Sequence, residues 1–125
     1  ADIRAPKANE GAGHPFMRPV IQKSITRVAN SIVDQEMLDW DEVVARLAGM
    51  TWRLDAEPWV AVFNPERSAM VTAKENVEVL DELLMCHLAP ISKAAIERAR
   101  KNYKAVKGIA YKTSKEDLEA NLAPE

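Results

Sequence analysis

Apolar residues recur every three or four positions in four stretches of the chain, which is the spacing of a helix with one apolar face. The first stretch begins after Pro19, and proline suits the first turn of a helix because its missing N–H needs no partner there. The buried stripe of this predicted helix consists of Val20, Ile21, Ile25, Val28, Ile32 and Val33.

The second stretch predicts a shorter helix that begins at Asp39 and ends at Gly49. Asp39 and Glu42 have the spacing of a capping box, in which each side chain accepts a hydrogen bond from the other residue's backbone N–H. Gly49 is expected to end the helix in a left-handed conformation, which glycine adopts without steric cost. The expected apolar positions are Trp40, Val43, Val44 and Leu47.

Two longer helices are predicted in the second half of the chain. The third helix begins at Thr72, where Glu75 would complete another capping box, and it ends before Pro90. The fourth helix runs from Ser92 to Gly108. Their apolar stripes are Val77, Leu80, Leu83, Leu84 and Leu88 in the third helix, and Ile96, Ala99, Tyr103 and Val106 in the fourth.

The two ends of the chain have weaker patterns. A last helix is predicted from Ser114 to Leu122, with Ser114 and Asp117 at its start. Residues 1–15 hold prolines and glycines and few apolar side chains, so we expect a linker there, with His14 as a solvated loop residue. Residues 16–122 are then a single, mainly α-helical domain of four to five helices. The chain does not start like a natural protein, and we expect it to be a C-terminal fragment of a longer one.

Residues 51–72 do not follow a helical pattern, and they hold Trp52 and Trp59. The apolar runs 59–63 and 69–71 are expected to pair as a short hairpin, or to form irregular chain, around the turn at residues 64–68. Stacked aromatic rings bind nucleobases in some proteins, but no basic cluster surrounds these two tryptophans. We therefore expect both to pack in the core, where each would bury about 150–250 Å².

Few residues in the chain are suited to catalysis or metal binding. The only cysteine is Cys86, and the two histidines, His14 and His87, are far apart in the sequence. We expect Cys86 to be a core residue in a protein of a reducing, cytoplasmic compartment, and His87 to be a structural residue near a helix end. We expect no metal site, no cofactor and no enzymatic activity, because no ligand set and no nucleophile with its base can be assembled. No apolar run is long enough to predict a membrane span.

Charge is distributed unevenly along the chain. Residues 34–82 carry 12 acidic and 4 basic side chains, a balance of −8, and residues 92–115 carry 8 basic and 1 acidic side chain, a balance of +7. A basic helix can contact the phosphate groups of DNA. The candidate DNA-binding residues are Arg98, Arg100, Lys101, Lys104 and Lys107. The alternative is a helix face that is merely solvated or paired with the acidic helices, in a protein–protein interaction or oligomerisation module without nucleic-acid contact.

The third and fourth helices also approach the spacing of a helix-turn-helix motif, with Cys86, Ile91, Ile96 and Ala99 at its apolar positions. That motif usually has glycine in its turn, because the backbone there has a positive φ. Pro90 stands at this place, and its ring forbids a positive φ. A looser pair of helices therefore stays open.

Short signatures spread over residues 15–90 carry a family resemblance. They are Arg18-Pro19-Val20-Ile21-Gln22, the helix at residues 40–47, Pro58-Trp59, Asn64-Pro65, Met70 and the leucine-rich third helix. These signatures resemble the C-terminal helical part of the DGQHR-domain proteins, a family that includes the B protein of the DNA sulfur-modification (phosphorothioation) system. The motif that names the family is absent from this chain, so no residue role carries over. The resemblance implies a non-catalytic part of a protein of DNA modification, defence or transcriptional control, with DNA and proteins of the same system as partners.

Overall fold

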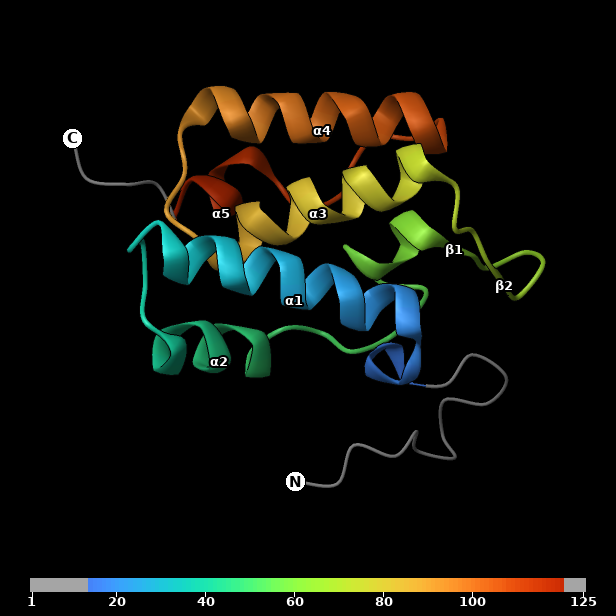
Figure 1. The fold of residues 1–125 in the computed structure, drawn as a ribbon. Coiled ribbons are helices and arrows are strands. Elements are labelled where there is room, and N and C mark those ends of the chain that lie inside the picture. Colours follow the sequence, from blue (N-terminus) through green and yellow to red (C-terminus); the bar gives the residue numbers. More distant parts are fainter. Residues whose placement is uncertain (1–13, 121–125) are drawn as a thin grey trace.

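The computed structural model describes residues 14–120, which form a mainly helical domain with one small antiparallel hairpin (Figure 1). The α-helices are α1 (Pro19–Asp34), α2 (Trp40–Ala48), α3 (Lys74–Leu88), α4 (Lys93–Lys107) and α5 (Lys115–Glu119). The 3-10 helices are η2 (Pro15–Met17) and η3 (Trp59–Val62), and the strands are β1 (Phe63–Asn64) and β2 (Ala69–Met70). The predicted fold class, a mainly α domain with a short insert, is confirmed. The linker predicted for residues 1–15 lies mostly outside the described residues.

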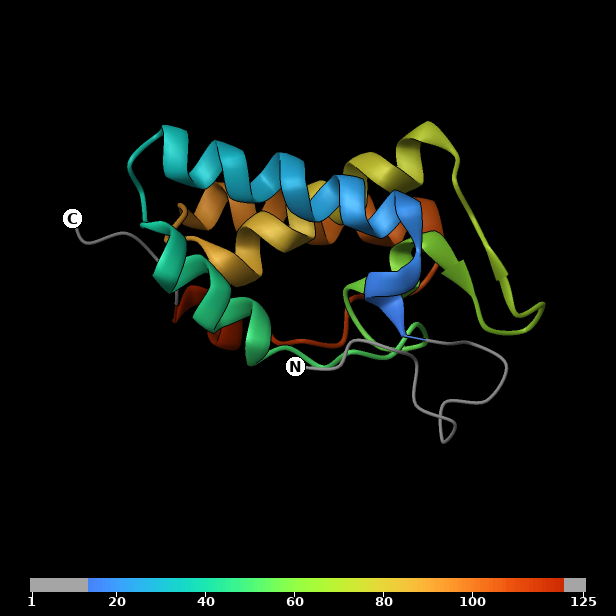
Figure 2. The same ribbon diagram turned by 60° about the horizontal axis from the view of Figure 1, so that its bottom comes forward.

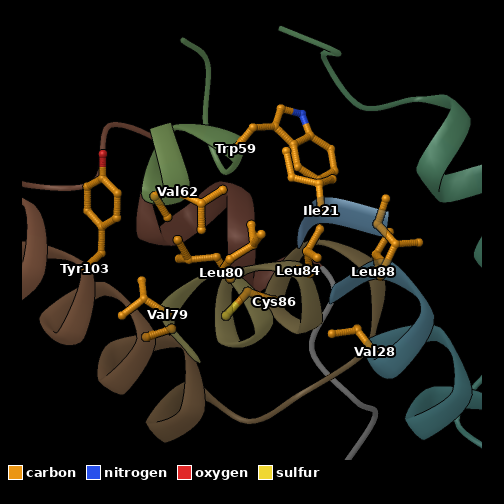
Figure 3. Packing of buried hydrophobic residues seen from close by; sticks show 14 of the residues in the cluster. Ile21, Val28, Trp59, Val62, Val79, Leu80, Leu84, Cys86, Leu88 and Tyr103 are labelled. Carbon is orange, nitrogen blue, oxygen red and sulfur yellow. The ribbon is translucent and has the colours of Figure 1, made fainter. Parts of the chain in front are cut away.

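Helix α3 lies at the centre of the domain, with α1 and α4 packed along two of its sides (Figures 1 and 2). Helix α2 and η3 also pack on α3, and α5 packs on α4. Figure 3 shows Leu80, Leu84 and Leu88 of α3 in one cluster with Ile21 of α1 and Trp59 of η3. The leucine stripe predicted from the sequence is therefore the central part of the core.

Several predicted helix ends are confirmed at atomic detail. The Asp39 carboxylate accepts from the N–H of Glu42 at 2.9 Å, and the Glu42 carboxylate accepts from the N–H of Asp39 at 3.2 Å. The Ser114 hydroxyl accepts from the N–H of Asp117 at 3.0 Å. Gly108 ends α4 with φ 79°, a conformation that side chains with a Cβ disfavour.

The second helix ends at Gly49 as predicted, but the left-handed conformation expected for Gly49 and the predicted start of the third helix are wrong. Gly49 has φ −84° and ψ −3°, because its N–H donates to the carbonyls of Ala45 and Arg46 and tightens the last turn without a left-handed residue. Thr72 does not cap α3, which begins at Lys74 after Ala73 without a side-chain cap. The N–H of Val71 donates to the carbonyl of Val62 at 2.7 Å, so the chain stays extended past the hairpin and the helix starts later than predicted.

The hairpin is shorter than predicted. Its two pairs are Phe63 with Met70 and Asn64 with Ala69, and the residues that precede Phe63 form η3 instead of a strand. The Asn64 side chain accepts from two N–H groups of the following turn, at 3.0 and 3.3 Å. Such side-chain turns favour Asn at this position, and this one fixes the bend of the hairpin.

Both tryptophans of this region pack inward, as predicted. Trp59 is fully buried and its indole N–H donates to the carbonyl of Thr51 at 2.6 Å. Trp52 stacks on Trp59 with ring centroids 4.7 Å apart. The prediction that His14 is a solvated loop residue is wrong, because its ring stacks on the other side of Trp52 at 5.2 Å and accepts from the N–H of Phe16. Trp52 is therefore held between the aromatic rings of His14 and Trp59.

The predicted apolar face of α2 is only partly buried. Val43 is buried and Leu47 is half-buried against the core, whereas Trp40 and Val44 are 50 % and 59 % exposed. Trp40 and Val44 are one turn apart on the outer side of α2. They form a small exposed apolar patch.

Replacing a core leucine of α3 tests its central position. We expect Leu84→Ala to lower the free energy of unfolding by about 2–5 kcal/mol, because the fully buried side chain leaves a cavity. The exposed Val44→Ala is the matched control and should change it by less than about 0.5 kcal/mol. Urea denaturation followed by circular dichroism measures both. Similar values for the two variants would contradict the central position of α3.

Candidate nucleic-acid interface

Helix α4 buries one side and exposes the rest. Its buried residues are Ile96, Ala99 and Tyr103, which follow the predicted stripe, and they pack toward α3. The Ser92 hydroxyl caps its start by accepting from the N–H of Ala95 at 3.2 Å. Helix α4 runs along the edge of the domain in Figure 1, so the side opposite its buried stripe faces outward.

Helices α3 and α4 form an antiparallel pair rather than a helix-turn-helix. Residues late in α3 are close to residues early in α4: Met85 and Ala95 line one hollow, while Val79 and Val106 line another. In a helix-turn-helix the two helices cross at about 90–120°. The side-by-side arrangement leaves no separate recognition helix, so the helix-turn-helix alternative is wrong and the looser helix pair is what the structure contains.

The side chain of Arg98 lies beside the acidic helix α3, although it is also exposed to solvent. Its Nε lies 3.6 Å from a carboxylate oxygen of Glu82, although the Arg98 side chain is 66 % exposed. The amide of Asn102 donates to the other oxygen of Glu82 at 2.9 Å. Glu82 therefore neutralises part of the charge that Arg98 could offer to a phosphate group.

Lys107 and Arg100 are partly withdrawn into the domain. The Lys107 ammonium donates to the carbonyl of Phe63 at 3.0 Å, and burial lowers its pKa from the usual value. Arg100 is half-buried, and one of its guanidinium nitrogens, Nη1, is enclosed without a hydrogen-bond partner among residues 14–120. Both residues serve the packing of α4 more than its outer surface.

Lys101 and Lys104 are the two candidate residues that remain fully available. Both are exposed, and neither makes an ion pair with any residue in the described range 14–120. They are three residues apart and so lie on neighbouring positions of the same face. Lys93, about three turns before Lys104, is exposed on this side as well, although it was not among the candidate residues.

The five candidate residues therefore do not form one continuous exposed surface. The structure brings Lys101 and Lys104 together, and turns the other three toward α3, the hairpin or the interior. Glu97 lies on the same outer side, where the ammonium of Lys115 binds it at 3.1 Å. The result is a small basic surface of two lysines, extended by Lys93.

The polar interior holds a second group of titratable residues that sequence analysis did not connect. His87 Nε2 and the Tyr111 hydroxyl are 2.8 Å apart, and the Tyr103 ring packs edge-on against Tyr111. The Glu57 carboxylate accepts from the N–H groups of Lys112 and Thr113, which holds the segment after α4 against this group. The expected structural role of His87 agrees with this position.

The buried titratable groups contribute to the packing of the interior. Burial raises the pKa of the Cys86 thiol to about 12, so the thiol stays protonated at neutral pH. Burial also lowers the pKa of His87 and raises that of Tyr111. Within residues 14–120, no three His, Cys, Asp or Glu side chains converge as metal ligands would.

Comparisons with known protein families, curated proteins and solved structures found no match. Among the helices of residues 14–120, none has the length and apolarity that crossing a membrane requires. The DGQHR-domain resemblance and the cytoplasmic location stay predictions.

The buried His87 predicts a pH dependence of stability. Its folded pKa is lowered from 6.5 by burial, so the unfolded chain binds this proton more readily and stability falls as the pH drops below about 6.5. Between pH 7.5 and 5.5 we expect the parent to lose up to about 1.4 kcal/mol more than His87→Gln. Denaturant unfolding at both pH values measures this difference. The contributions of the other titrating groups cancel, because the parent and the variant share these groups. Equal losses in the two proteins would contradict a His87 that is buried in its neutral form.

Proposed function

We propose that this chain is a non-catalytic domain that contacts the phosphate backbone of DNA through the outer side of α4. The observation that carries the proposal is the pair Lys101 and Lys104, two exposed cations that form no ion pair with the described residues. Lysines contact phosphate groups as point charges without reading the base sequence. The contact is therefore weak, salt-dependent and independent of sequence, as suits an accessory domain of a larger protein.

The family resemblance supports the proposed kind of protein in which this DNA contact occurs. The signatures between residues 15 and 90 belong to structural parts of the domain: Pro19 starts α1, Trp59 lies in the core, and Asn64 forms the turn of the hairpin. They concern the fold and not a catalytic site. We place the domain in a protein of DNA modification, defence or transcriptional control, whose activity lies in another part of that protein.

A charge reversal at the outer lysines tests the DNA contact. We expect Lys101→Glu/Lys104→Glu to weaken binding to a labelled DNA duplex about tenfold or more at low salt, because two attractions become repulsions. The slope of log affinity against log salt concentration should also fall by about 2. Fluorescence anisotropy over a salt series measures both quantities.

The control carries the same change of charge on other surfaces. Lys23 of α1 and Arg67 of the hairpin turn are both exposed, and Lys23→Glu/Arg67→Glu should bind DNA with a smaller loss. Arg98→Ala should also have a small effect, since Glu82 already pairs with Arg98. No binding by the parent at low salt, or equal losses in the two double variants, would overturn the proposal.

A second candidate function is self-association or protein binding through α2. It is favoured by Trp40 and Val44, which expose large apolar surface one turn apart. Exposed aromatic residues are enriched where proteins bind one another. A patch of two side chains is small for a stable interface, so this candidate ranks below DNA contact.

Sedimentation velocity tests the α2 patch. If it mediates self-association, the parent should show a concentration-dependent increase in sedimentation coefficient, and Trp40→Ser/Val44→Ser should sediment as a monomer throughout. A parent that is monomeric at every concentration would remove self-association as a function of this patch.

A further inference from the structure

A groove follows the solvent-facing side of α3, with α1 and α4 beside its first half and α4 alone beside its second half. It consists of two adjoining hollows of about 320 and 420 Å³, and Glu82 lines both. The first hollow lies beside α1 and the start of α4, and the second lies beside the last turns of α4. Figures 1 and 2 show α3 between these two helices. The groove therefore extends along α3 for roughly three turns, from Met85 to Glu75.

The first hollow has an apolar floor. Its apolar lining residues are Val28, Met85, Ile91 and Ala95. Met85 and Ile91 are only partly buried, so their side chains remain available to a binding partner. Methionine adapts its shape easily and is common in grooves that accept apolar anchors.

The charges at the rim of this hollow are paired with each other. Arg27 donates two hydrogen bonds to the Asp81 carboxylate, at 3.0 and 3.2 Å. Arg98 lies 3.6 Å from Glu82 on the other rim. An apolar side chain can therefore enter between the two ion pairs without burying a charge that lacks a partner.

The second hollow carries unpaired negative charge. Glu75 and Glu78 are exposed on α3 and make no ion pair with the residues of the described range. Lys74, one turn before Glu78, forms no ion pair with it either. The opposite wall consists of Ala105 and Val106, which leave room above the carboxylates.

We propose that this groove binds an amphipathic helix of a partner protein, with an apolar anchor at Met85 and Lys or Arg side chains at Glu78 and Glu75. Glu78 and Glu75 lie about 10 and 15 Å from Met85 along the axis of α3. On a partner helix these distances correspond to seven and ten residues. Positions i, i+7 and i+10 of a helix share one face, so one amphipathic helix can satisfy the anchor and both carboxylates.

Charge complementarity decides what kind of partner fits. The unpaired carboxylates repel DNA and acidic segments. The apolar floor does not stabilise a partner whose side chains are all polar cations. A helix with an apolar end and a basic end matches both halves of the groove, which is a recurring mode of peptide recognition. None of the groove residues is Lys101 or Lys104, so this proposal is independent of the DNA contact.

Selection from a displayed library of random peptides of about 15 residues, or four helical turns, tests the groove. The folded chain serves as the target, and the charge-reversed Glu75→Lys/Glu78→Lys chain removes peptides that bind elsewhere. We expect enriched peptides to carry a large apolar residue with Lys or Arg seven and ten positions away. Their affinity should fall about tenfold or more for the charge-reversed chain, and also for Met85→Lys.

Two further variants keep the result interpretable. Asp41→Lys/Glu66→Lys makes the same change of charge at exposed positions outside the groove and should bind the enriched peptides like the parent. Glu75→Gln/Glu78→Gln removes the charges without reversing them and should give an intermediate affinity. The proposal is overturned if no peptide is enriched, if the enriched peptides lack the basic residues, or if the control weakens binding as much as the groove variant.

Discussion

The irregular segment between α2 and α3 has backbone carbonyl groups that it cannot satisfy by itself, and the helices around it supply the donors. The Asn76 amide donates to the carbonyl of Ala61 at 2.9 Å, and the Lys107 ammonium donates to that of Phe63 at 3.0 Å. A buried carbonyl without a partner costs free energy comparable to a lost hydrogen bond. This constraint fixes the position of the segment against α3 and α4, and the fully buried Trp59 then completes the core from the same side.

The same constraint limits the basic surface of α4. A lysine that donates to a buried backbone carbonyl is no longer available to a phosphate group, which is the case for Lys107. Arg98 is likewise drawn toward Glu82 of α3. An exposed ion pair of this kind contributes little to stability, but Glu82 also accepts a hydrogen bond from Asn102, so two residues one turn apart on α4 are held to one carboxylate of α3. Part of the charge asymmetry in the sequence therefore orients α4 on α3, and only the cations on its far side are left to bind a partner.

The sequence predicts the helices well because the apolar spacing and the caps are local features. Asp39, Ser114 and Gly108 act within a few residues of themselves, so their roles could be assigned without the fold. The conformation of Gly49 and the start of α3 could not, because the start of α3 depends on a hydrogen bond from Val71 to Val62 of η3. The candidate site was predicted only in part for the same reason. Helical spacing places Lys101 and Lys104 on one face, but the partners of Arg98 and Lys107 come from α3 and β1, which are distant in the sequence.

The two proposed binding surfaces are neighbours on α4, because Lys101 lies one turn before Ala105, which lines the groove. Lys104 and Val106 are two residues apart on α4 and therefore point about 160–200° away from each other, with Lys104 on the outer side and Val106 in the groove. DNA held by Lys104 would leave the groove accessible. A basic helix in the groove would in turn neutralise Glu75 and Glu78, whose negative charge opposes the approach of DNA to this domain. The two partners would then favour each other's binding through electrostatics alone, without a change in the conformation of α3 or α4.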